Sequence, residues 1–100
     1  MAEFASFREF YPFYLGEHAN PTCRRLHFVG TTLVIACLAA LALTGNAWWI
    51  AGALVCGYGF AWVGHFFFEK NKPATFQYPF YSLIGDFVMF RDMLTGRIRF

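Results

Sequence analysis

The chain has 100 residues, of which 58% are hydrophobic, 22% aromatic and only 14% charged. Soluble domains carry about 25% charged residues, so this composition indicates that lipid covers much of the surface. A formal net charge of +2 is too small to predict a nucleic-acid partner. At this length the chain forms at most one domain, which we assign to residues 1–100 as an all-α membrane protein.

The first predicted element is an amphipathic helix over residues 4–15. Aromatic side chains recur there at helical spacing, at Phe4, Phe7, Phe10, Tyr11 and Tyr14. An apolar face of this kind is typical of a helix that lies in the membrane interface. Pro12 is expected to bend or end the helix.

A long uncharged stretch predicts an antiparallel transmembrane hairpin. No Asp, Glu, Lys or Arg occurs between Arg25 and Glu69. This uncharged stretch is too long for one transmembrane span and suits two spans of about 20 residues each. The motif TGNAWW interrupts it with turn residues, followed by tryptophans that favour a membrane interface. We therefore expect helices over 21–43 and 47–68.

Basic residues mark one end of this hairpin, at Arg24, Arg25, Lys70 and Lys72, whereas the 45–47 loop has none. The positive-inside rule therefore places the basic end, which also carries the histidines, and both termini in the cytoplasm. The compact chain suggests a bacterial inner membrane.

The last predicted helix covers residues 76–95. Its apolar run is short for a span and contains Pro79 and Asp86, and basic residues follow it. A re-entrant or interfacial helix is favoured over a third transmembrane helix.

The three histidines, His18, His27 and His65, are predicted to meet at the cytoplasmic mouth of the hairpin. His27 and His65 lie almost equally far from the central turn, about 27 Å along their helices at 1.5 Å per residue. His18 precedes a helix start that Asn20 and Pro21 favour. A capping loop at that point can fold His18 over the mouth.

A stripe of small residues on the second span supports this arrangement. Ala53, Gly57 and Ala61 recur every four residues, which allows another helix to approach closely. The same spacing continues to His65 and Glu69, so both are expected to point toward protein rather than lipid.

A site of three imidazoles and the carboxylate of Glu69, with Asp86 as a further carboxylate, suits zinc, iron, nickel or copper. If coordination positions on the metal stay open, non-haem Fe(II) and oxygen chemistry are favoured. Other interpretations remain open. His65 and Glu69 also fit a hydrogen-bonded pair at a helix end, and Asp86 an ion pair or a role in orienting a ligand. Arg24 and Arg25 either mark the membrane boundary or hold an anionic headgroup or carboxylate.

The stretches YLGEHANPTCRRLHFVGT, GYGFAWVGHFFFEKNKPATF and SLIGDFVMF…LTGRI together carry a resemblance over nearly the whole chain. They resemble the family of small membrane proteins whose fungal member is the 2-hydroxy-fatty-acid dioxygenase of phytosphingosine breakdown. The resemblance implies an Fe(II)-dependent enzyme with His18, His27 and His65 as ligands. It also implies that dioxygen is used to remove one carbon from a 2-hydroxy fatty acid.

Five further residues are our own candidates within this hypothesis: Glu69 and Asp86 as catalytic, Arg24 and Arg25 as substrate-binding, and Asn20 as support for the ligands. The expected partners are membrane lipid, a fatty-acyl substrate and dioxygen, with zinc or no metal as alternatives to Fe(II). The rival hypothesis is a non-enzymatic membrane protein that organises lipid or helix–helix assembly, including assembly of homo-oligomers. Nothing in the sequence frames a porphyrin for haem ligation by His27 and His65.

Overall fold

The computed structural model describes residues 4–100 and is helical, without strands, over that range. The all-α class is therefore confirmed, while residues 1–3 of the expected domain lie outside the described residues. A π-helical segment, η1, continues α3, and a short 3₁₀ turn, η2, precedes α4. The elements in chain order are α1 Phe7–Gly16, α2 Pro21–Thr44, α3 Trp48–Val63, η1 Gly64–Glu69, η2 Ala74–Phe76 and α4 Pro79–Leu94.

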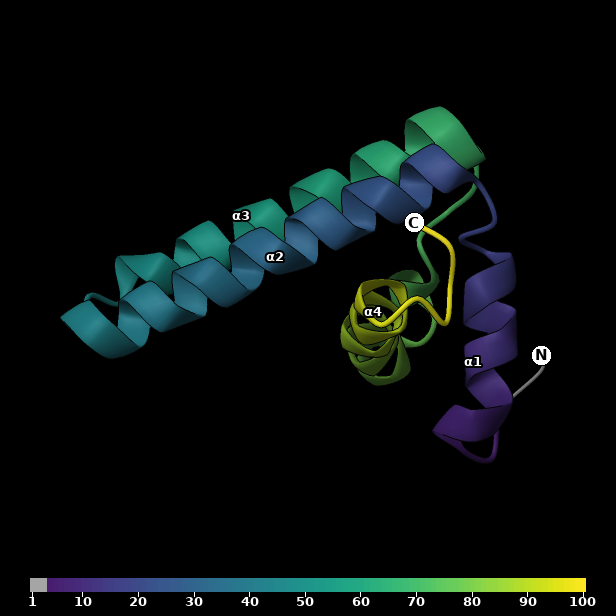
Figure 1. Ribbon diagram of the computed structural model, residues 1–100, viewed down its shortest axis with the longest axis horizontal. Helices are drawn as coiled ribbons and strands as arrows, with labels where there is room; N and C mark the ends of the chain where they lie inside the picture. The colour runs from purple at the N-terminus through teal and green to yellow at the C-terminus, as the bar shows by residue number, and fades with distance from the viewer. Residues whose placement is uncertain (1–3) are drawn as a thin grey trace.

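The two longest helices, α2 and α3, lie side by side and run in opposite directions (Figure 1). The side chain of Asn20 accepts the backbone N–H groups of Thr22 and Cys23 and so caps α2. At the other end Gly45 adopts a left-handed conformation with φ of 69°, which glycine reaches without steric cost. The chain therefore turns sharply from α2 into α3.

Small residues allow α2 and α3 to approach closely. A Cβ atom added at Gly30 would lie 3.0 Å from the Cβ of Phe60, and one at Gly57 would lie 3.1 Å from a methyl group of Val34. Ala53 is also buried. The small-residue stripe of the second long helix thus packs against the first long helix of the same chain.

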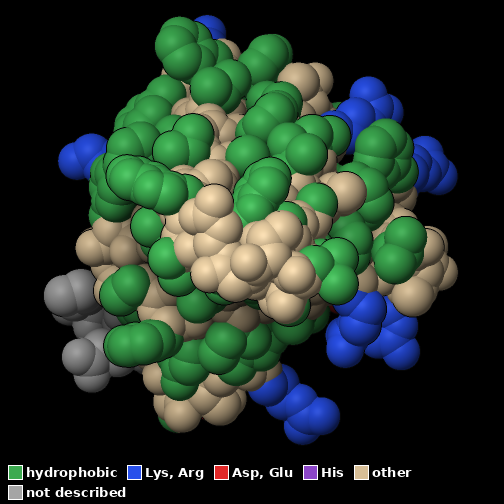
Figure 2. Space-filling view, turned by 90° about the vertical axis from the view of Figure 1, so that its left-hand side faces the viewer, with side chains coloured by type: hydrophobic (Ala, Val, Ile, Leu, Met, Phe, Trp, Pro, Cys, Tyr) green, Lys and Arg blue, Asp and Glu red, His purple; other side chains and the backbone are tan. Residues whose placement is uncertain are grey.

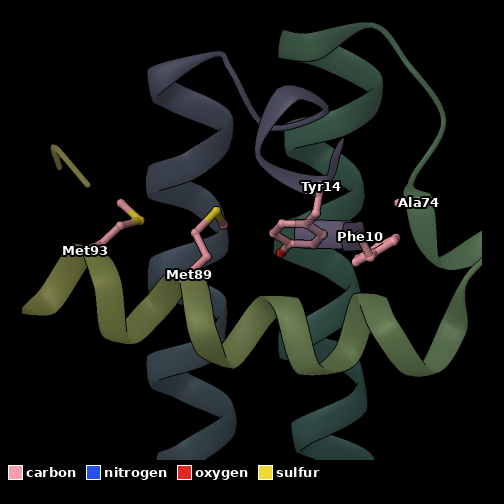
Figure 3. Packing of buried hydrophobic residues seen from close by; sticks show 5 residues of the cluster. All are labelled: Phe10, Tyr14, Ala74, Met89 and Met93. Atoms are coloured by element: carbon pink, nitrogen blue, oxygen red, sulfur yellow. The ribbon is translucent and has the colours of Figure 1, made fainter. Parts of the chain in front are cut away.

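A compact apolar core joins α1 to α4 beside one end of the long helices. Figure 3 shows α4 crossing α2 and α3, with Phe10 and Tyr14 of α1 and Met89 and Met93 of α4 in the core. A Cβ atom added at Gly85 would lie 2.9 Å from the ring of Tyr14. The absence of a side chain at Gly85 therefore lets α1 rest on α4.

Pro12 lies inside α1 and does not end it, because the helix continues to Gly16. The Ser6 side chain accepts the N–H of Glu9 and caps the first turn. Of the two expectations for Pro12, that it bends or ends the helix, the second does not hold, and the helix predicted to continue past Pro12 does so.

Two helices of the described chain are long and apolar enough to cross a membrane, Pro21–Thr44 and the combined segment Trp48–Glu69. Only 22% and 17% of the residues in their most apolar windows are buried. Seen from the end that carries the α2–α3 loop, hydrophobic side chains cover much of the surface, and Lys and Arg lie at the rim (Figure 2).

Candidate metal centre

Three buried histidines meet where α1, α2 and η1 come together. His18 follows α1, His27 lies nearly two turns inside α2, and His65 is the second residue of η1. One ring nitrogen from each lies within 4.8 Å of the others. The Nε2 atom of His18 is 3.1 Å from that of His27 and 2.9 Å from that of His65.

Local structure explains this convergence. The N–H of His18 bonds to the carbonyl of Leu15, which curls the chain back after α1. A Cβ atom at Gly64 would lie only 2.9 Å from the sulfur of Cys23. Because Gly64 has no side chain, η1 can pack directly on the first turn of α2, one turn before His27.

The Nδ1 atom of every histidine already has a hydrogen-bond acceptor. The carbonyl of Tyr14 lies 2.7 Å from Nδ1 of His18, and the carbonyl of Cys23 lies 2.8 Å from Nδ1 of His27. A carbonyl can only accept, so both imidazoles carry their proton on Nδ1. Their Nε2 atoms are then free to donate a lone pair.

His65 is held in the same tautomer by Asn71. The Nδ2 group of Asn71 donates to the carbonyl of Glu17 at 3.1 Å, which fixes the amide orientation. Its Oδ1 atom then faces Nδ1 of His65 at 2.8 Å and accepts its proton. Lys70, in the left-handed region with φ of 59°, makes the turn that brings Asn71 into this position.

Three Nε2 lone pairs therefore point at one another without a proton between them. In this state they cannot hydrogen-bond to each other, whereas a metal cation would satisfy all three. Two nitrogens that each lie about 2.1 Å from a metal and are separated by a right angle lie about 3.0 Å apart. The 2.9 and 3.1 Å separations are close to this value, so His18 can share one cation with His27 and with His65, and the residues fit a metal.

Burial and the neighbouring imidazoles of His27 and His65 hold the pKa of His18 well below its usual range. The ring of His18 is therefore neutral at physiological pH, as a metal ligand must be. The ring of Tyr14 stacks on it with centroids 4.0 Å apart. Tyr14 thus supports His18 through both its ring and its backbone carbonyl.

Tyr14 also connects the histidines to Asp86 on α4, because its hydroxyl donates to an Asp86 carboxylate oxygen. Burial raises the pKa of Asp86 to about 6, although the hydrogen bond from Tyr14 opposes the rise. Burial and the Asp86 charge raise the pKa of the Tyr14 hydroxyl well above its usual range. The Tyr14 hydroxyl therefore stays protonated and remains the donor.

A small cavity of about 20 Å³ adjoins the three imidazoles, enough for a water-sized group. Asp86 and Ser82 of α4 line it together with the histidines. The Ser82 side chain is 4% exposed, and its hydroxyl has no hydrogen-bond partner. A buried hydroxyl without a partner is costly, so this atom is available to a ligand.

The other predicted residues lie around this centre rather than in it. Glu69 accepts the backbone N–H of Asn20 at 2.8 Å, and the Asn20 side chain caps α2. Arg24 has a buried Nε atom without a hydrogen-bond partner. Arg25 is exposed, donates to the carbonyl of Phe100 at 2.9 Å and lies over its ring. Neither arginine lines the cavity beside the histidines.

Sequence reasoning missed Tyr14, Asn71 and Ser82. All three lie within the stretches that carry the family resemblance, but Tyr14 was assigned only to an apolar helix face, and Asn71 and Ser82 were given no role. Their roles depend on how α1, η1 and α4 dock, which no local pattern in the sequence reports.

The chain belongs to the Mpo1-like family, described as 2-hydroxy-palmitic acid dioxygenase Mpo1-like, which it matches over residues 4–98. This finding confirms the family resemblance and indicates dioxygenase chemistry at the level of the family. No curated protein and no solved structure matches the chain.

Proposed function

We propose that this member of the Mpo1-like family is an Fe(II)-dependent membrane dioxygenase that shortens 2-hydroxy fatty acids by one carbon. His18, His27 and His65 would be the iron ligands. The observation that carries the proposal is the convergence of three Nε2 atoms whose tautomers are set by acceptors at Nδ1.

Iron is favoured over zinc because the family description names a dioxygenase and zinc has no redox chemistry. Three imidazoles on one side leave further coordination positions for substrate and dioxygen. Bound Fe(II) would supply the electron transfer that dioxygen needs to react with a closed-shell substrate. In the overall balance, a 2-hydroxy acid and O₂ give the shorter acid, CO₂ and water.

The surrounding side chains suit the polar end of such a substrate. The unpartnered Ser82 hydroxyl can donate to the substrate carboxylate, and Asp86 can accept a hydrogen bond from the 2-hydroxyl group. Arg24 lies near enough to help lower the pKa of His18, and its positive charge favours an anionic headgroup. We assign positioning of the α1–α2 linker, rather than ligation, to Glu69, because it already accepts the N–H of Asn20.

We further propose that α2 and the segment Trp48–Glu69 cross the membrane as an antiparallel hairpin. Most residues in the apolar windows of these two helices are exposed on the protein surface. Exposing so much apolar surface to water is unfavourable, whereas lipid would cover it. The helices α1 and α4 would lie at the cytoplasmic interface, near the basic residues that favour that side.

The assembly hypothesis loses the feature that favoured it. Gly57 packs against Val34 of the same chain, so the small-residue stripe is used within the protomer. An enzymatic role also explains the three tautomers, whereas an assembly role does not.

The test is anaerobic reconstitution of the purified protein with Fe(II), followed by elemental analysis and oxygen uptake with 2-hydroxypalmitate. We expect about one iron per chain. We also expect oxygen uptake with 2-hydroxypalmitate and none with palmitate, which lacks the 2-hydroxyl group. Alanine variants of His18, His27 and His65 should lose iron and turnover, while the exposed Gln77→Ala control should keep both. Full iron content and turnover in all three histidine variants would sink the proposal.

A further inference from the structure

A second, larger cavity of about 360 Å³ runs between α4 and the two long helices. It shares four lining residues with the small cavity at the histidines: His27, Tyr58, Thr75 and Asp86. The two cavities therefore meet at the candidate metal centre, and the larger one leads away from it along the hairpin.

The larger cavity is polar at one end and apolar along the rest of its length, apart from Thr31. On α2 its lining residues follow one helix face from His27 through Thr31 and Val34 to Leu38. Antiparallel to them on α3, the lining residues run from Tyr58, which also lines the small cavity, through Leu54 to Ile50 near the α2–α3 loop. A ligand that fits must have one polar end and one long apolar end.

The length of the cavity matches a lipid chain. From His27 to Leu38 the α2 backbone rises about 16 Å at 1.5 Å per residue. That is about half of the roughly 30 Å hydrocarbon thickness of a bilayer, the depth that one acyl chain spans. Leu83 and Phe87 of α4 line the same cavity, so part of the chain would be covered by protein.

We propose that this cavity binds the alkyl chain of the 2-hydroxy fatty acid, with its carboxyl end at the histidines and its methyl end between Leu38 and Ile50. These two residues would set the preferred chain length. The inference rests on the proposed function for the identity of the polar end. Each buried methylene group is worth about fourfold in affinity, so chain length should be strongly discriminated.

The first experiment replaces residues that line the cavity without disturbing helix packing. Leu38 is 44% exposed and Leu54 is 56% exposed, so each position accommodates a larger side chain. Leu38→Trp fills the far end and Leu54→Trp the middle. Val55→Trp is the matched control, because Val55 neighbours Leu54 but is 72% exposed and lies outside the cavity.

With the iron-loaded enzyme, kcat/KM is measured for saturated 2-hydroxy acids of increasing chain length. Leu38→Trp should lower the ratio of long-chain to short-chain kcat/KM about tenfold or more, and Leu54→Trp should lower it further. Leu38→Ala, which empties space, should shift the preference toward longer chains. Unchanged ratios in all the cavity variants, or an equal shift in Val55→Trp, would overturn the inference.

The second experiment needs no metal and no turnover. Metal-free protein in lipid nanodiscs is photolabelled with a 2-hydroxy fatty acid that carries a diazirine at its methyl end. We expect labelled peptides that contain Leu38 and Ile50, with labelling reduced in Leu54→Trp and retained in Val55→Trp. Equal labelling of the same peptides by a diazirine phospholipid would mean that bulk lipid fills the cavity, and would overturn the inference.

The two proposals fail in different ways. Labelling at Leu38 and Ile50 without any oxygen uptake would support the chain site and count against the dioxygenase. Oxygen uptake with labelling elsewhere would leave the dioxygenase in place and remove the chain site.

Discussion

Asn71 sets the tautomer of His65, although it lies in the loop that follows the long hairpin. Its amide group donates to the carbonyl of Glu17, and its oxygen therefore accepts the Nδ1 proton of His65. One loop side chain thus links the end of α1 to a candidate ligand on η1. Partners of this kind orient metal ligands and raise their basicity.

Asn71→Ala should lower metal affinity about 10- to 100-fold, the usual cost of losing a residue that orients a ligand. Without its acceptor, His65 can protonate either nitrogen and rotate. A Co(II) titration followed by visible absorbance measures the affinity. Asn46→Ala, in the loop at the opposite end of the long helices, is the control. Unchanged affinity in Asn71→Ala would mean that the tautomer of His65 does not matter.

Glu69→Gln should keep metal affinity within a few fold, whereas Glu69→Ala should reduce it. The Gln oxygen can still accept the N–H of Asn20, so the linker that carries His18 stays in place. The expected loss in Glu69→Ala is about 1 kcal/mol, typical of one hydrogen bond. If Glu69 is itself a ligand, Gln and Ala will weaken binding equally in the same titration.

Gly64→Ala should destabilise the protein by about 1–3 kcal/mol, the usual cost of overpacking. The new methyl group would lie 2.9 Å from the Cys23 sulfur and 3.2 Å from its Cα atom. Gly59→Ala is the matched control, since open space surrounds that position and alanine improves helix propensity. Thermal unfolding in detergent compares them, and equal midpoints would contradict the close packing of η1 on α2.

Stability should fall as pH rises from about 4 to about 6 because of Asp86. Its pKa in the folded state is raised to about 6, so the folded protein binds more protons than the unfolded chain across this window. Above pH 6 both states are ionised and the dependence on Asp86 ends. Asp86→Asn should therefore remove this part of the pH dependence from the thermal midpoint.

In Tyr14→Phe, the pH range over which Asp86 lowers the stability should extend above pH 6. The variant loses the hydrogen bond that favours the ionised carboxylate, so the Asp86 pKa rises further. Infrared spectroscopy can follow the carbonyl band of the protonated carboxyl group during a pH titration, with Asp86→Asn to identify the band. A band that disappears at the same pH in Tyr14→Phe and wild type would refute this assignment.

The helical class and the two long apolar helices were predictable from the sequence, because the uncharged stretch has the length of two transmembrane helices with turn residues between them. The meeting of the three histidines was also predictable. His27 and His65 lie nearly equally far from one turn, so two antiparallel helices bring them level, and the cap at Asn20 places His18 beside them.

The surroundings of the histidines were not predictable. The stripe that ends in His65 and Glu69 assumed α-helical spacing, but η1 is π-helical, and a π turn closes i→i+5 rather than i→i+4 bonds. Glu69 consequently meets Asn20, and no sequence pattern announces such a turn. Asp86 was expected to form an ion pair or to orient a ligand, yet its hydrogen-bond partner is Tyr14 of α1, while Arg91 pairs with Asp92.

His18 and His27 flank the start of α2, whereas His65 lies 47 residues after His18, so a metal held by all three would act as a reversible cross-link between the two ends of the hairpin. Whatever binds only the folded state stabilises it, by about 2.7 kcal/mol when free ligand is at 100 times its dissociation constant. Metal supply would then govern how long the protein persists in the cell as well as how fast it works. A chain made during metal shortage would unfold more often and be cleared sooner by proteases.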